Sequence, residues 1–122
     1  MNHLAHAWLA GNDDDLLVGS LLGDFWRGRP DPAWHPMLAA GVRLHRRVDS
    51  FTDAHPAVVA ARALFAAPFR RYAGILLDVW FDHLLALDFA DRCGMPLRDF
   101  ADRVYAVLRG ADAGLPPSFR LF

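Results

Sequence analysis

The sequence of 122 residues contains no lysine and no glutamate, so its 13 basic residues are all arginine and its 14 acidic residues are all aspartate. Together with abundant alanine and leucine, this usage is typical of GC-rich coding sequence. It therefore weakens any argument that arginine replaces lysine here in order to bind phosphate. The formal net charge is −1, which gives no overall signal for nucleic-acid binding, and we expect no nucleic-acid partner.

Cysteine is nearly absent, and long apolar runs are missing. The single cysteine, Cys93, excludes an internal disulfide and a cysteine-based zinc site. A metal site would have to use His and Asp side chains, a donor set that favours Mn, Fe, Mg or Zn. The chain lacks a charge-free apolar run of about 18 residues, so we expect no transmembrane helix and no membrane partner. The first residues do not resemble a signal peptide, which predicts a cytoplasmic protein.

Apolar residues are plentiful, at 54% of the chain. This share excludes intrinsic disorder and allows a sizeable core. No repeat, low-complexity segment or long linker divides residues 1–122, which we expect to form a single domain. Apolar residues recur with a period of about 3.6 in nearly every segment, which predicts an all-α fold. The expected helices cover residues 4–9, 16–26, 36–48, 56–66, 70–92 and 96–108.

Local signals define several helix boundaries. Asp13 to Asp15 supply a cap and a negative first turn for the second helix, and Asp53 can cap the fourth. Gly19 and Gly23 share one helix face and predict close packing there. The chain after Gly110 resembles a loop that ends on apolar residues with nothing after them to pack against. These residues, Phe119, Leu121 and Phe122, predict a domain that is truncated at its C-terminus.

The stretch from Leu76 to Leu87 is apolar almost all the way round, yet it contains Asp78, Asp82 and His83. A helix that is apolar on every face is buried, and a buried carboxylate needs a partner or a cation. Asp78 and Asp82 are one turn apart, so their charges repel each other, and burial increases the cost unless a cation or a proton intervenes. The stretch therefore predicts facing partners or a bound metal.

Other helices also place His or Asp side chains among apolar positions. His45 and Asp49 are four residues apart, Asp24 lies on the packing face of the second helix, and His6 lies near the start. Each has a structural alternative. His6 and His45 could be hydrogen-bonded core residues. Asp49 could cap the following segment, and Asp24 could be solvated at a frayed helix end.

Together these groups are typical of a metal centre in a helical bundle, where side chains project inward from facing helices. Such a centre lowers the pKa of a bound water and makes a nucleophile at neutral pH. The pair Asp82 and His83 would allow one group to bind metal while the other moves a proton. Arginines flank the clusters and suit bidentate phosphate binding, although solvated helix ends are the simpler interpretation of arginines in this composition.

The same residues resemble the acyl carrier protein phosphodiesterase family in four motifs, which keep the family's order and spacing over about residues 1–90. The motifs are Met1-Asn2-x-Leu4-Ala5-His6, Gly19-x-Leu21-Leu22-x-Asp24-Phe25-x-Arg27-Gly28, Gly41-x-x-x-His45-Arg46-Arg47-x-Asp49 and Leu77-Asp78-x-x-x-Asp82-His83-x-Leu85. The resemblance implies an HD-domain-like helical bundle, a divergent branch of the HD-type metal-dependent phosphohydrolases, with manganese as the divalent metal. It also implies hydrolysis of the phosphodiester between 4′-phosphopantetheine and a serine of holo-acyl carrier protein, which leaves the apo form.

The resemblance also assigns roles to residues of this chain. The implied metal ligands are His6, Asp24, His45, Asp49, Asp78, Asp82 and His83. The implied catalytic residues are Asp24, Asp82 and His83, and Arg27, Arg46 and Arg47 would bind the phosphate or the acidic surface of acyl carrier protein. The chain departs from the family at Trp8 and Arg43, where members often carry histidine, and the family chain continues beyond Phe122.

Two alternatives to this function stay open. One is an HD-type phosphohydrolase that acts on a nucleotide or another small phosphoester. The other is a non-catalytic helical module that binds a partner through its apolar side.

Overall fold

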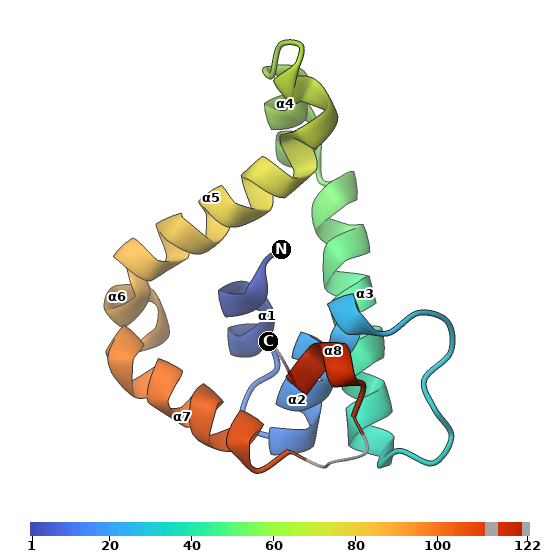
Figure 1. Ribbon diagram of the computed structural model, residues 1–122. Helices are drawn as coiled ribbons and strands as arrows, with labels where there is room; N and C mark the ends of the chain where they lie inside the picture. Colours follow the sequence, from blue (N-terminus) through green and yellow to red (C-terminus); the bar gives the residue numbers. More distant parts are fainter. Residues whose placement is uncertain (112–114, 121–122) are drawn as a thin grey trace.

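The computed structural model describes residues 1–111 and 115–120, and all regular structure within them is helical (Figure 1). The prediction of an all-α fold is confirmed. The elements are α1 (His3–Leu9), α2 (Asp14–Leu22), η1 (Gly23–Phe25), α3 (Pro36–Ala54), α4 (Pro56–Ala63), η2 (Phe69–Tyr72), α5 (Ala73–Leu87), α6 (Phe89–Cys93), α7 (Leu97–Arg109) and α8 (Pro117–Arg120). Among the residues described, no helix combines the length and apolar character needed to cross a membrane.

Three helices outline the molecule. Figure 1 shows α3, α5 and α7 as the sides of an open triangle, with α4 at the corner between α3 and α5 and α6 at the corner between α5 and α7. Helix α1 lies inside this triangle and contacts both α2 and α5, while α2 packs along α3. The N-terminal helix is thus placed between elements from distant parts of the chain.

The contact between α2 and α3 is close because glycine faces glycine. A Cβ atom added at Gly19 would overlap the backbone oxygen of Leu38, and one added at Gly41 would overlap the backbone oxygen of Leu16. A Cβ added at Gly23 would overlap the ring of His45. The predicted close packing at Gly19 and Gly23 is confirmed.

The apolar core lies at the base of the triangle, between α1, α2, α3 and α7. Leu22 is completely buried, and the buried rings of Phe89 and Phe100 each lie 5.4 Å, between centroids, from the ring of Trp8. Phe119 of α8 is also buried, with its ring 5.6 Å from that of Phe25. The expectation that the tail is a loop with unpacked apolar residues is therefore wrong for Phe119, while Leu121 and Phe122 lie outside the described residues.

The expected continuous helix over residues 70–92 is wrong. Residues Phe69–Tyr72 form a 3₁₀ turn, α5 ends at Leu87, and Asp88 leaves helical geometry with φ −120° and ψ 15° before α6 begins. The break allows the next residue, Phe89, to turn into the core, where it is 1% exposed. Burial of this ring outweighs the local preference for one unbroken helix, because burying a large aromatic side chain contributes about 1.5–3 kcal/mol.

Other helix ends also differ from expectation. Helix α2 ends at Leu22 and tightens into η1, and α3 extends to Ala54 instead of ending near residue 48. The prediction that Asp53 caps α4 is wrong, because His55 takes that position and its Nδ1 accepts a hydrogen bond of 3.1 Å from the amide of Ala57. Asp13 caps α2 as predicted, since its carboxylate accepts from the amide of Leu16 at 2.9 Å.

Helix α5 is not buried on every face. Ala73 and Leu77 are its buried residues, and six of its large apolar side chains are exposed. These are Ile75, Leu76, Val79, Trp80, Leu84 and Leu87. We call this set the exposed apolar face of α5.

Candidate metal centre

Two helices that are far apart in sequence bring two histidines into contact. His6 of α1 is fully buried, His45 of α3 is 4% exposed, and their rings stack with 3.8 Å between centroids and 16° between planes. Asp49 follows one turn after His45. Its Oδ1 lies 3.0 Å from Nε2 of His6, and its Oδ2 lies 3.2 Å from Nε2 of His45. His6, His45 and Asp49 thus offer ligand atoms that all lie within 4.8 Å of one another.

The backbone of α2 determines how the His45 ring is used. Nδ1 of His45 lies 2.7 Å from the carbonyl oxygen of Ser20. Because a carbonyl oxygen can only accept, Nδ1 donates and carries a proton. Nε2 is then the nitrogen directed at the carboxylates, and Asp24 of η1 approaches it to 3.1 Å. A ring nitrogen whose role is set by a hydrogen bond on its other side is the usual arrangement of a metal-ligating histidine.

The pKa values follow from these contacts. The hydrogen bond to His45 lowers the pKa of Asp24, despite the opposing effect of burial. Burial lowers the pKa of His45, but the hydrogen bond and charge of Asp24 and the charge of Asp49 outweigh it and raise the pKa overall. Burial and the neighbouring His45 lower the pKa of His6. The stacked pair therefore divides into one ring that favours the cation and one that favours the neutral form.

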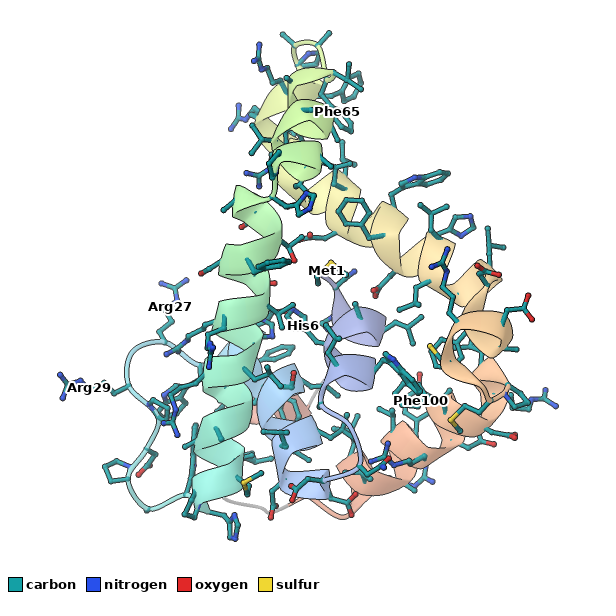
Figure 2. All side chains as sticks on the ribbon, turned by 180° about the vertical axis from the view of Figure 1, so that it is seen from behind. Met1, His6, Arg27, Arg29, Phe65 and Phe100 are labelled. Atoms are coloured by element: carbon teal, nitrogen blue, oxygen red, sulfur yellow. The ribbon has the colours of Figure 1, made fainter. Side chains whose placement is uncertain are left out.

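A second cation lies next to the pair. The amino group of Met1 is 3.0 Å from Oδ1 of Asp49 and 3.1 Å from Oδ1 of Asp78 on α5. Burial lowers the pKa of this amine, but the hydrogen bonds to Asp49 and Asp78 outweigh burial and raise it. Figure 2 shows Met1, which precedes α1, and His6 of α1 in the space between α3 and α5. The carboxylates of α3 and α5 therefore face one another across a position that holds a positive charge.

The structure does not bring Asp82 and His83 into this cluster. Both carboxylate oxygens of Asp82 accept hydrogen bonds from α1, at 2.8 Å from the amide of Leu4 and 3.1 Å from the amide of Ala5. His83 is exposed, with its ring 5.2 Å from the ring of Trp80. The roles that the sequence suggests for these two residues stay predictions.

The three arginines also differ in position. The guanidinium of Arg46 donates to the carbonyl oxygens of Gly28 at 2.7 Å and Trp26 at 3.2 Å, so it attaches the loop after η1 to α3. Arg27 and Arg47 are exposed, and Figure 2 shows Arg27 pointing away from the body of the molecule. Arg46 thus has a structural role in addition to any contact with a ligand.

Sequence reasoning missed two contributors to the centre. The carbonyl of Ser20 is a backbone atom, so no residue type signals it. The position of the Met1 amine depends on how α1 enters the triangle of helices. The close approach of α2 to the His45 ring had a signal in the spacing of Gly19 and Gly23, although the spacing did not indicate which side chain would fill the space.

The fold and the site together define an all-helical protein with a candidate His and Asp metal centre built between its N-terminal helix and α3. The family model described as acyl carrier protein phosphodiesterase matches residues 1–122, so the chain belongs to this family.

Curated relatives agree with this assignment. The acyl carrier protein phosphodiesterase of Pectobacterium atrosepticum is 42% identical over 121 residues, which are 98% of this chain and 63% of the relative. That of Photorhabdus laumondii is 48% identical over 89 residues, or 73% of this chain and 45% of the relative. That of Escherichia coli is 43% identical over 101 residues, or 82% and 52%. The chain spans about half the length of the curated relatives it matches. No solved structure gives a significant match.

Proposed function

We propose that residues 1–122 form a helical, metal-dependent phosphohydrolase domain that acts on holo-acyl carrier protein. The reaction is hydrolysis of the phosphodiester that links 4′-phosphopantetheine to a serine, giving apo-acyl carrier protein. The observation that carries the proposal is the convergence of His6, His45 and Asp49 within 4.8 Å in a member of this family. The relatives named as acyl carrier protein phosphodiesterases support the substrate.

The residues present fit a divalent cation. Two imidazoles and a carboxylate are a nitrogen and oxygen donor set, which suits Mn, Fe, Mg or Zn. Manganese is the metal that the family resemblance implies. The amine of Met1 already places a positive charge between Asp49 and Asp78. Nε2 of the buried His6 ring faces Asp49, and Nδ1 of the same ring has no hydrogen-bond partner in the described structure, a costly state for a buried group. His and Asp ligands from separate helices also support a divergent member of the HD-type phosphohydrolases.

Different groups of the chain would orient the ligands, hold the metal and accept a proton. When bound, the metal supplies a water of lowered pKa and a positive charge for the phosphate. The carbonyl of Ser20 keeps the proton on Nδ1 of His45 and leaves Nε2 for the cation. Asp24 and Asp49, whose carboxylates lie 3.1 and 3.2 Å from Nε2 of His45, would hold the cation or accept a proton from the water.

The remaining predicted residues take outer positions in this proposal. Asp78 lies across the cluster from Asp49 and would complete the ligand shell from α5. The exposed His83 would exchange protons with solvent. Arg27 and Arg47 would contact the phosphate or the acidic surface of acyl carrier protein, and Arg46 would hold the loop that carries Arg27.

The test is to incubate the chain with Mn²⁺ and holo-acyl carrier protein and to follow the intact mass of the carrier protein. We expect a loss equal to the phosphopantetheine group. Asp49→Asn removes a carboxylate of the cluster and should abolish the loss. Asp53→Asn changes an exposed aspartate one turn further along α3 and should leave the loss unchanged. Unaltered holo-acyl carrier protein after incubation with the unmodified chain under several divalent metals would contradict the proposal.

A second candidate function is a non-catalytic helical module, which is favoured by the exposed apolar face of α5. Large contiguous apolar surfaces often mark sites of interaction with another polypeptide. Metal binding distinguishes the two functions. A module has no need of Mn²⁺, so a purified chain that contains no metal and shows no thermal shift with added Mn²⁺ would favour it.

A further inference from the structure

Helix α1 lacks a cap from its own sequence. The first amide groups of any α-helix have no partner within the helix, and a side chain at the residue just before the helix usually accepts from them. Asn2 occupies this position, but its side chain forms no capping hydrogen bond. The first bond within the helix runs from the amide of His6 to the carbonyl of Asn2 at 3.1 Å.

Asp82 supplies the missing cap from another helix. Its two oxygens accept from the amides of Leu4 and Ala5 at 2.8 and 3.1 Å, across 78 and 77 residues of sequence. These amides are the second and third of the helix, the same ones that a local cap would satisfy. The negative carboxylate also interacts favourably with the positive end of the helix dipole.

The position of His6 depends on such tertiary contacts. Helix α1 has seven residues, and helices shorter than about 12 residues are marginal on their own in water. The hydroxyl of Ser20 donates to the carbonyl of His6 at 3.2 Å, and Ala5 and Ala7 pack against the core. Asp82 restrains the N-terminal end of α1, at the two residues immediately before His6.

We propose that Asp82 is a positioning residue, which caps α1 from α5 and thereby holds His6 against His45 and Asp49, and that it is not a metal ligand. Both of its oxygens are engaged by amide donors of α1, which leaves the carboxylate committed to the helix end. This inference rests on the proposed metal centre. It assigns the family-like Asp82 position a role in building the site.

The test compares three changes in the full chain by calorimetric titration with Mn²⁺ alone. Asp82→Ala removes both acceptors and should weaken Mn²⁺ binding by about tenfold, the lower range for loss of a group that orients a metal ligand. Asp82→Asn keeps one acceptor oxygen and replaces the other with an NH2 group that cannot accept, so it should lose one of the two hydrogen bonds and weaken Mn²⁺ binding less than Asp82→Ala does. Adding Asn2→Asp to Asp82→Ala returns a negative charge to the positive end of the α1 dipole and should recover part of the lost affinity.

Controls separate capping from other effects. Asp91→Ala removes an exposed carboxylate of α6, and Asn2→Asp alone adds one near α1; both should bind Mn²⁺ like the unmodified chain. Hydrogen exchange at the amides of residues 6–9 should become faster in Asp82→Ala and slow again in the double variant. This readout needs no metal and remains usable if a variant is only partly folded.

Several results would overturn the inference. One is a double variant whose exchange is restored while its Mn²⁺ affinity stays low, since Asp82 would then act as a ligand. A second is Asp82→Asn losing as much affinity as His45→Ala. A third is Asp82→Ala with unchanged affinity or unchanged exchange. If the unmodified chain binds no Mn²⁺, the proposed function fails instead, and the exchange rates alone then support or refute the cap.

Discussion

Helices α3 and α5, which lie on either side of α1, differ in how far their side chains are buried and paired. On the α3 side, His45 is buried and both of its ring nitrogens have partners, from α2, η1 and its own helix. On the α5 side, Asp78 is more than a third exposed, and most large apolar side chains of the helix are exposed. The comparison shows that close helix packing, more than local hydrophobicity, determines where polar groups are concentrated in this protein.

The largest effect is expected from a core deletion on the well-packed side. Leu22→Ala removes a completely buried side chain of α2 and should lower the free energy of unfolding by about 3 kcal/mol, within the range for buried leucines. Urea denaturation followed by circular dichroism measures the change. A loss below about 1 kcal/mol would show that the packing around α2 is looser than its burial indicates.

A somewhat smaller effect is expected from the metal. With Mn²⁺ at about 100 times its dissociation constant, the unmodified chain should gain about 2.7 kcal/mol of stability. His45→Ala should gain none, because its Nε2 is central to the cluster. His55→Ala, a change at the exposed cap of α4, should retain the full gain. Thermal unfolding with and without Mn²⁺ checks this, and equal shifts in both variants would place the ion elsewhere.

The next effect in size is expected from disrupting the contact between α2 and α3. Gly19→Ala introduces a Cβ into the backbone of α3 and should cost about 2 kcal/mol, as for other overpacked sites. Gly110→Ala is the matched control, because its Cβ would lie 3.6 Å from the backbone oxygen of Val107, which is an ordinary van der Waals contact. Equal denaturation midpoints for the two variants would contradict the close packing.

The smallest effect on stability is expected from the exposed apolar face of α5. Leu87 is 72% exposed, so Leu87→Ser should change the free energy of unfolding by no more than about 0.5 kcal/mol. Light scattering should show less self-association at high concentration, because the apolar area in contact with water is smaller. A large destabilisation would mean that this face is covered in solution, which would narrow the contrast between the two sides.

Part of this picture could be predicted from the sequence. Helical periodicity indicated the all-α fold, and the glycine spacing indicated close packing on one face of α2, although it did not indicate that α3 is the partner. The spacing of His45 and Asp49 placed them on one face, as found. These features depend on residues close together in sequence, for which helix geometry is known in advance.

The rest depends on contacts between distant segments. The break at Asp88 follows from burial of Phe89 against α1 and α7, which no local pattern contains. Asp82 is predicted to be a metal ligand because its residue type and its apolar surroundings suggest a cation. In the structure, amide groups of α1 donate to both of its oxygens, and a backbone amide has no signature in a sequence.

The contact of Gly19 with Gly41 also sets a distance within the candidate metal centre. Ser20 follows directly after one glycine, and His45 lies one turn after the other, so the separation of the two helix axes sets the 2.7 Å between the Ser20 carbonyl and the imidazole. An apolar contact without a titratable group thereby holds Nδ1 of His45 against the Ser20 carbonyl and leaves Nε2 facing Asp24 and Asp49. The orientation of the imidazole in the centre thus follows from how closely two helix backbones approach each other.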